Sequence, residues 1–489
     1  MKQDNKPTRL FELVFSAALL LTSFASCSDD VLDTKSETQI LSGDSWSSSE
    51  QILAQVYGLY SSIKDIRFYG GAYHVYGELR GEEFVTTGGN TGDGTAIWQQ
   101  NALASADQVA FVWATGYATI NNANIFIDKI TPSTVISGEL KKNYIAEAKF
   151  LRAYAYFGLV QVYSRPYWDG NGSKRGLPLR LTGNTAFTNG DLAPVSVGKI
   201  YEQILQDLDD AETDLPESYA SAALYSTRAH KATAIALKTR VYLVKGEYDK
   251  VVTEAAKLAP NPADPVYTAG AVTHKLESAL TTIFSTTNVG TYTGPEAILT
   301  FPFNNDDKGG SQRSPAYFYN TYYTINDDPA ASIVHKESAS VFANADDSRR
   351  AFVSGNKFLK YQNKSFLDYI PAIRYAEVLL NYAEASARTS GDLTAATALL
   401  NAVRQRSNPS WTFDAAETST KEALIETILN ERRIELFGEG FRVFDLLRLG
   451  QTLPAKGTVP SVEPTFNNYV WPVPASEAST NLLINDFNE

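Results

Sequence analysis

The sequence predicts a mostly α-helical protein, in which helical hairpins form a scaffold and a loop-rich insert carries a few short β-strands. Three observations lead to this fold class. Residues 140–163 place apolar side chains on one helical stripe, two later segments each pair two helical stretches across a short turn, and residues 265–365 break the helical pattern. Helical elements therefore flank the insert on both sides.

The clearest single helix is predicted over residues 140–163. The spacing of three and four residues between its apolar side chains is typical of a helix with one buried face. That stripe consists of Tyr144, Ala148, Leu151, Ala155, Leu159 and Val162. The same spacing predicts further helices over residues 51–64, 110–130 and 197–215.

The two helical hairpins are predicted at residues 231–258 and 373–404. In the first, the turn is Gly246-Glu247-Tyr248, and in the second it is Gly391-Asp392-Leu393. A glycine-containing turn between two helices with small side chains at their crossing is similar to the tetratricopeptide hairpin. We therefore expect a tetratricopeptide-like scaffold.

Another helix is expected after Ser419, because Ser419 and Glu422 have the spacing of a capping box. The insert at about 265–365 is rich in Thr, Tyr, Asn and Gly, and residues 296–303 read as a short strand.

Charge and composition exclude several classes of protein. The net charge is −12, whereas a nucleic-acid-binding protein needs a basic surface that displaces counterions. The four histidines are scattered, and residues 304–307 lack the spacing of an EF-hand, so we expect no metal site and no cofactor. No nucleophile elbow of the Gly-x-Ser-x-Gly kind occurs.

The N-terminus has the pattern of a lipoprotein signal. Lys2, Lys6 and Arg9 precede an apolar stretch at 13–21, which is too short to span a bilayer, and Ala25-Ser26 lead to Cys27. Cys27 is the only cysteine in the chain. We expect residues 1–26 to be removed, Cys27 to be acylated, residues 27–48 to form a flexible tether, and residues 49–489 to form one domain.

The same region also suggests where the protein is located, and it leaves one alternative to the lipoprotein interpretation open. The acidic pair after Ser28 resembles the export signal of Bacteroidetes lipoproteins that are sent to the outer face of the cell. The alternative is an ordinary signal peptide with an incidental cysteine.

Several blocks of sequence resemble the SusD/RagB family of glycan-binding lipoproteins. The most specific is ILNERRIELFGEGFRVFDLLRLG at 428–450, in which Phe441 stands where the family frequently has His. Further matches lie at 112–124, 146–156, 373–385 and 400–406 and in the closing Trp471-Pro472-Val473-Pro474 turn. The resemblance covers essentially the whole chain, with residues 265–365 matching least.

The resemblance implies a tetratricopeptide-like fold under a loop-rich ligand face, and it implies no catalysis. It also implies a partner, a SusC-like TonB-dependent outer-membrane barrel that receives the oligosaccharide. Together with the predicted anchor, it places the protein on the outer membrane, lipid-anchored and facing the cell exterior.

The charged residues of the 428–450 block have two possible roles. A glycoside hydrolase would pair Glu431 with Glu435, or use Glu439 and Asp445, as its two carboxylates. The structural interpretation is that arginine forks hold carboxylates where helices cross, which keeps those carboxylates ionised. We assign the structural role to Glu431, Arg432, Glu435, Arg442, Asp445 and Arg448.

Candidate ligand-binding residues are aromatic rings in loops, because rigid rings offer contact area at little cost in conformational entropy. Trp98 follows a polar loop and precedes Asn101, and the resemblance places a Trp and an Asn of the ligand site in this region. Tyr69 and Tyr73 lie in a Gly-flanked loop. A group in the insert comprises Tyr317, Tyr319, Tyr322 and Tyr323.

The leading hypothesis is therefore a non-enzymatic protein that captures oligo- or polysaccharide for uptake. Three alternatives remain: capture of peptide or glycoprotein-derived cargo by the same lid mechanism, a helical glycoside hydrolase, and a repeat scaffold for protein assembly.

Overall fold

The computed structural model describes residues 45–88, 94–185, 190–284, 292–307, 313–335, 341–363, 365–391 and 393–486. Backbone contacts group residues 53–489 into one unit, separate from residues 1–52. The predicted signal, Cys27 and most of the predicted tether lie outside the described residues, so those domain boundaries stay predictions.

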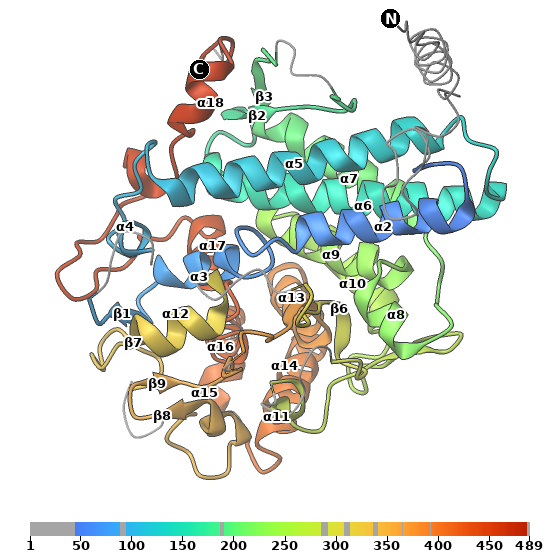
Figure 1. The fold of residues 1–489 in the computed structure, drawn as a ribbon. Helices are drawn as coiled ribbons and strands as arrows, with labels where there is room; N and C mark the ends of the chain where they lie inside the picture. Colours follow the sequence, from blue (N-terminus) through green and yellow to red (C-terminus); the bar gives the residue numbers. More distant parts are fainter. Residues whose placement is uncertain are drawn as a thin grey trace, which may run out of the picture. The chain divides into compact units, whose positions relative to one another are not determined.

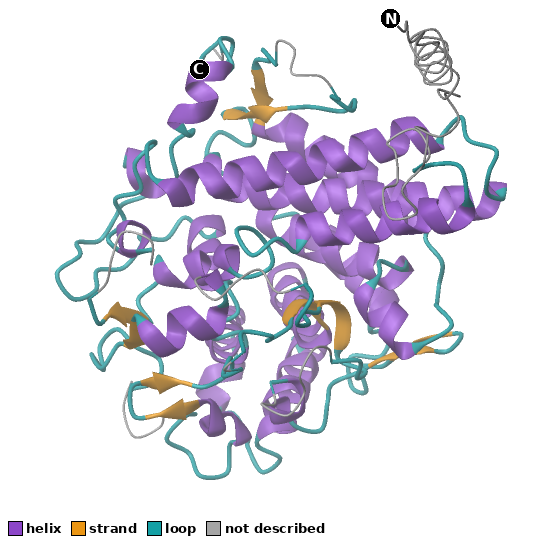
Figure 2. Ribbon diagram, viewed as in Figure 1, coloured by secondary structure: helices purple, strands orange, loops and turns teal. Residues whose placement is uncertain are grey.

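Helices make up most of the secondary structure (Figures 1 and 2). The longer ones are α2 (Ser49–Ile63), α3 (Ala72–Leu79), α5 (Asp107–Ile130), α6 (Gly138–Tyr163), α7 (Val197–Asp214), α9 (Lys231–Lys245), α10 (Tyr248–Leu258), α13 (Tyr375–Thr389), α14 (Thr394–Ser407) and α16 (Lys421–Glu435). The shorter ones are α4 (Thr95–Trp98), α8 (Ala222–Thr227), α11 (Leu280–Ile283), α12 (Pro315–Thr321), α15 (Ala415–Thr418), α17 (Arg442–Arg448) and α18 (Ala475–Thr480), with 3-10 turns η4 (Ser348–Phe352) and η5 (Asn467–Tyr469).

The strands are short and form antiparallel pairs. The pairs are β1 (Phe84–Thr86) with β7 (Tyr323–Ile325), β2 (Arg175–Pro178) with β3 (Pro194–Ser196), β4 (Tyr267–Ala269) with β5 (Val272–His274), β6 (Ala297–Phe301) with β10 (Ile370–Arg374), and β8 (Val353–Ser354) with β9 (Lys357–Phe358). The predicted fold class, mostly helical with a few short strands, is confirmed.

Helices α5, α6 and α7 pack side by side and form one layer (Figure 1). Ser137 begins α6, since its side chain accepts a hydrogen bond from the backbone of Leu140. The predicted stripe of α6 is buried, and so is most of the rest of its C-terminal half, because helices cover it from more than one side.

The two predicted hairpins are present as α9–α10 and α13–α14, and α10 packs against α13. Gly246 ends α9 in the left-handed conformation, with φ of 73°, which a glycine adopts at little cost. The chain therefore reverses at the predicted turn.

Two local predictions are wrong in detail. Helix α16 is capped by Thr420, whose side chain accepts from the backbone of Ala423, so Ser419 does not form the expected capping box. Residues 373 and 374 belong to β10, not to a helix, because β6 provides a hydrogen-bonding partner that the helical pattern of the sequence could not reveal.

The predicted insert contributes β4 to β9 and the short helix α12. Its strands β7 and β9 and helix α12 lie beside β1 and α3, which come from the N-terminal part of the domain (Figure 1). Within the described ranges, no helix combines the length and the apolar character needed to cross a bilayer.

Candidate functional site

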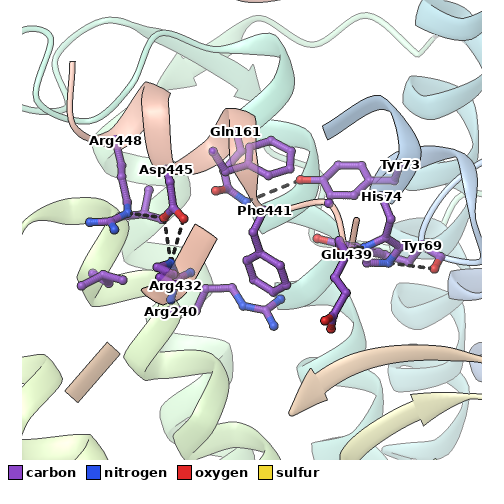
Figure 3. Close-up of a pocket in the computed structure, with 14 residues that line it drawn as sticks. Tyr69, Tyr73, His74, Gln161, Arg240, Arg432, Glu439, Phe441, Asp445 and Arg448 are labelled. Atoms are coloured by element: carbon purple, nitrogen blue, oxygen red, sulfur yellow. Dashed lines mark hydrogen bonds and ion pairs between the residues drawn. The ribbon is translucent and has the colours of Figure 1, made fainter. Parts of the chain in front are cut away.

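The charged residues of the 428–450 block lie in the interior, where α16 and α17 meet α3 and the hairpin helices (Figure 3). Arg432 binds Asp445 at 2.8 Å, and Arg448 binds both Asp445 and Glu384, at 2.8 and 2.7 Å. Arg442 binds Glu82 at 2.5 Å. The pairs of Arg448 with Glu384 and of Arg442 with Glu82 join segments that are distant in the sequence.

A second group of ion pairs surrounds Glu435, which is fully buried. Its carboxylate binds Arg406 at 2.5 Å, Arg374 at 3.1 Å and Arg349 at 3.3 Å. Glu431 lies one helical turn earlier and binds Arg349 at 2.6 Å. Burial acts to raise the pKa of Glu435, but the neighbouring arginine charges outweigh it and hold that pKa well below its ordinary value.

This arrangement does not suit glycoside hydrolysis. A general acid needs a raised pKa and both carboxyls must reach substrate, whereas Glu431, Glu435 and Glu439 are at most 3% exposed. The cavity drawn in Figure 3 has a volume of about 30 Å³, which is room for little more than water. This part of the interior is therefore a packed junction between elements.

The backbone of this junction is fixed by Gly440 and by a buried glutamate. Glu78 accepts hydrogen bonds from the N–H groups of Gly440 and Phe441, at 2.7 and 3.0 Å. Gly440 has φ of 90°, and a Cβ there would lie 2.5 Å from the Cα of His74, so only glycine fits. Burial raises the pKa of Glu78 to about 7.

Tyr69 and Tyr73, two of the candidate ligand-binding residues, lie beside this junction and are not exposed, so neither offers an open ring face. Tyr69 is 2% exposed and stacks on Tyr154 with ring centroids 4.1 Å apart. Tyr73 is 5% exposed and stacks on Phe444. Tyr69 precedes α3 and Tyr73 lies in the first turn of α3 rather than in the expected loop, and their rings pack onto α6 and α17, where burial of apolar area is favourable.

Trp98, another candidate ligand-binding residue, is also buried. Its Nε1–H donates to the carbonyl of Phe84 at 2.7 Å, and the ammonium of Lys456 lies 5.8 Å from the ring centroid. Asn101, three residues later, is exposed. Ligand binding by these residues stays a prediction.

The tyrosine group of the insert divides into two kinds. Tyr319 and Tyr323 are buried, at 3% and 2% exposure, and Tyr319 donates to the carbonyl of Gly438, so neither offers an open ring face. Tyr319 and Tyr323 lie on the sides of α12 and β7 that face the core. Tyr317 and Tyr322 lie on the other side and are half-buried.

Tyr317, Tyr322 and Phe366 form the α12 ring group. The ring of Tyr317 lies 5.3 Å from that of Tyr322 and 5.9 Å from that of Phe366, both nearly edge to face. The two tyrosine hydroxyls lie 3.0 Å apart. Asn320, which is exposed, adds a polar side chain on α12. Half-exposed rings with polar neighbours can stack against a sugar and bond its hydroxyls.

Phe366 has φ of 59°, which is a strained conformation for a bulky aromatic residue. Its loop is held by Asp368, whose carboxylate accepts from the N–H groups of Gln362 and Asn363 at 3.2 Å. Such strain concentrates at ligand sites and switch regions, so this backbone outlier supports a functional role for the ring group.

A polar hollow opens beside the start of α12. Its volume is about 450 Å³, within the range of roughly 300–1,000 Å³ typical of ligand sites. Phe303 and Ile66 supply its apolar part. Its charged lining consists of Lys64, Asp65, Arg67, Asp306, Asp307 and Arg313.

No group of three or more potential metal ligands occurs in the ranges that the structure describes. His230 and His274, distant in the sequence, meet in the interior with their Nε2 atoms 3.0 Å apart. Their remaining ring nitrogens already have protein partners, so this pair is not a metal centre.

Sequence reasoning missed Phe366 and the hollow. Nothing in the local sequence marks Phe366 as strained, and the hollow combines residues near 61–67, 303–307 and 313, which only the fold brings together. Tyr317 and Tyr322 were candidates already because they belong to an unusually Tyr-rich stretch, and their role in ligand binding stays a prediction.

Two family models match successive parts of the chain. One, described as the SusD family, matches residues 282–488, and the other, described as starch-binding associating with outer membrane, matches residues 30–243. The two matches lie on either side of residues 244–281.

Relatives match over nearly the full length. SusD-like protein P2 of Formosa agariphila is 26% identical over 96% of this chain and 98% of its own. A crystal structure of a SusD superfamily protein from Bacteroides fragilis has a TM-score of 0.80 and 29% identity, over 90% of this chain and 100% of that one. A laminarin-binding SusD-like protein has a TM-score of 0.67 at 20% identity, over 90% and 99%, which is a likeness of fold.

Proposed function

Because the chain belongs to the SusD-like family, we propose that it binds oligo- or polysaccharide at the cell surface and delivers it to a SusC-like TonB-dependent outer-membrane transporter. In this role the protein is a non-enzymatic capture module for nutrient uptake. The family model that matches residues 30–243 is described as associating with the outer membrane, and this supports the location.

The observation that carries the proposal is the α12 ring group. Its three rings are held by one another and by a strained loop, so little conformational entropy is lost when a ligand stacks on them. The ring group lies in the insert that matches the family motifs least, and a segment that differs between relatives is suited to setting the choice of sugar.

The proposal that the protein does not cleave its ligand is supported by the state of its acidic residues. The carboxylates of the 428–450 block are buried and bound to arginine or lysine, with Glu439, for example, 2.7 Å from Lys360. The α12 ring group itself contains no carboxyl pair.

We propose that the protein is held to the membrane through acylated Cys27, facing the cell exterior. Each buried CH₂ of an acyl chain contributes roughly 0.8 kcal/mol, so several chains form a firm anchor. A tether between Cys27 and residue 48 would let the domain sit on its transporter.

The proposal is tested by native affinity electrophoresis of the purified protein against plant, host and microbial polysaccharides, with an assay for reducing ends in parallel. Retardation by a glycan without release of reducing ends is the expected result. Release of reducing ends would show a hydrolase, and absence of retardation by every glycan would shift the function to peptide or glycoprotein-derived cargo.

A further inference from the structure

We propose that the polar hollow beside α12 binds an anionic group of the ligand, the carboxylate of a uronic acid or a sulfate ester, through Arg313. This inference rests on the proposed function and specifies its substrate class. The protein would then favour acidic glycans over neutral ones of the same backbone.

Two of the cations that line the hollow already have partners. Lys64 forms an ion pair with Asp307 and donates to the carbonyl of Pro302 at 2.8 Å. Arg67 binds Asp65 through both Nε and Nη2, at 2.9 and 2.6 Å. Their charges are therefore compensated before any ligand arrives.

Arg313 is different. Its guanidinium lies over the ring of Phe111, with Cζ 4.4 Å from the ring centroid, and in the part of the chain that the structure describes it has no hydrogen bond or ion pair. Its charge acts on the carboxylate of Asp65, but both oxygens of that carboxylate already accept hydrogen bonds from Arg67.

The contact with Phe111 restrains the guanidinium, and its N–H groups make no hydrogen bond within the described ranges. This is the arrangement in which arginine binds a carboxylate or sulfate through two parallel hydrogen bonds. The side chain is half-buried, so an anion there is less screened than at an open surface.

The remaining acidic residue, Asp306, does not cancel this site. It is exposed, and its backbone N–H binds Asn304 in a local turn. A charge in contact with solvent is screened and interacts weakly, whereas Arg313 is half-buried.

The test compares matched ligands by titration calorimetry with protein purified after expression of the full chain. One pair is polygalacturonate and its methyl ester, and the other is a sulfated galactan and its desulfated form. Within each pair the backbone is the same and only the charge differs, so the two pairs also distinguish a carboxylate from a sulfate.

The variants are Arg313→Ala, Arg313→Lys and, as a control for net charge, Lys199→Ala, which removes a cation from the exposed side of α7. We expect the charged member of one pair to bind at least tenfold tighter than its neutral counterpart. Arg313→Ala should abolish that preference, Arg313→Lys should retain part of it, and Lys199→Ala should leave it unchanged.

The inference is overturned if charged and neutral members bind equally, or if Arg313→Ala keeps the preference. Binding of neutral glycans alone would overturn the inference and leave the proposed function standing. If neither these ligands nor the wider polysaccharide panel is bound, both fail. Equal melting temperatures of the variants would show that a loss of binding results from the changed site and not from unfolding.

Discussion

Arg374, like Arg349, forms ion pairs with three buried carboxylates. It is 2% exposed and lies within 3.1 Å of Glu296, Glu435 and Glu439. Removing one partner of a buried ion pair leaves an uncompensated charge, at a cost of about 3–5 kcal/mol. We therefore predict that Arg374→Met lowers the free energy of unfolding by that amount in urea denaturation.

A matched control is Lys199→Met. Lys199 forms an exposed pair with Glu202, with both side chains more than 60% exposed, and such pairs contribute roughly 0–1 kcal/mol. Equal effects of the two substitutions would contradict the view that the buried network stabilises the junction of β10 with α16.

For single residues, the sequence predicted the pairing of charged side chains better than it predicted the burial of aromatic rings. Glu435 and Arg432 alternate charge along one helix, which favours pairing, and both lie in ion pairs. The burial of Tyr69 could not be predicted, because its loop covers α6 so closely that a Cβ at Gly158 would lie 2.6 Å from the tyrosine hydroxyl.

Among the elements, the turn between α9 and α10 allows a clean test. Gly246 has φ of 73°, and a Cβ at this position would meet nothing within 4 Å, so only backbone conformation opposes a side chain there. The left-handed conformation costs an L-residue about 1–2 kcal/mol. We predict that Gly246→Ala destabilises the protein by roughly 1 kcal/mol, measured as a lower urea midpoint.

Gly58 provides the opposite case. It lies inside α2, and a Cβ there also meets nothing within 4 Å. Because alanine favours the helix, Gly58→Ala should stabilise the protein by about 0.4–1 kcal/mol. A loss of stability in both variants would argue against the turn geometry at Gly246.

The contact between α9 and β5 includes a pair of neutral histidines. His274 Nδ1 donates to the carbonyl of Pro295 at 3.3 Å, so its Nε2 accepts from His230, and His230 Nδ1 accepts from the hydroxyl of Thr233 at 2.9 Å. Every donor and acceptor position in this series of hydrogen bonds is filled without an additional proton. Burial lowers the pKa of His274 to about 4 and, together with the neighbouring His274, that of His230 to about 3.

The sign of the pH effect follows from these pKa values. Below pH 6.5 the unfolded histidines take up protons and the folded ones do not, so stability is present above pH 6.5 and falls as the pH drops toward 4. Each histidine contributes roughly 1.4 kcal/mol per pH unit in that window. We predict that the stability difference between the native protein and His274→Asn shrinks between pH 7 and about pH 4.5.

Urea denaturation at the two pH values measures this difference, and His335→Asn serves as a control outside the pair. A difference that stays constant with pH would mean that His274 takes up a proton in the folded protein as readily as in the unfolded chain.

The sequence predicted most elements because their signal is local. The spacing of apolar residues placed α6 and both hairpins, and a glycine marked the turn after α9. Strand β10 was missed at residues 373 and 374 because its partner β6 is more than seventy positions away along the chain, and a pairing of that kind leaves no periodic pattern in one sequence.

In the whole molecule, the helical scaffold supports a surface that is formed largely by the insert. The layer of α5 to α7 and the two hairpins bring together the N-terminal part of the domain and the 428–450 block. The insert rests on this support through α12 and β7, and it exposes the α12 ring group and borders the polar hollow. The proposed ligand surface could not be located from sequence alone, because it combines residues from four separate segments.

The central claim, that the protein captures glycan on the α12 ring group without cleaving it, is tested most directly by Tyr322→Ala. The measurement is native affinity electrophoresis against the polysaccharide that retards the native protein, and the control is Tyr57→Ala, which removes a tyrosine that is 47% exposed on α2. We predict that Tyr322→Ala weakens binding about tenfold, or about 1.4 kcal/mol, and that Tyr57→Ala has no effect. Unchanged retardation of Tyr322→Ala, or retardation lost equally in both variants, would contradict the assignment of the ligand site to α12.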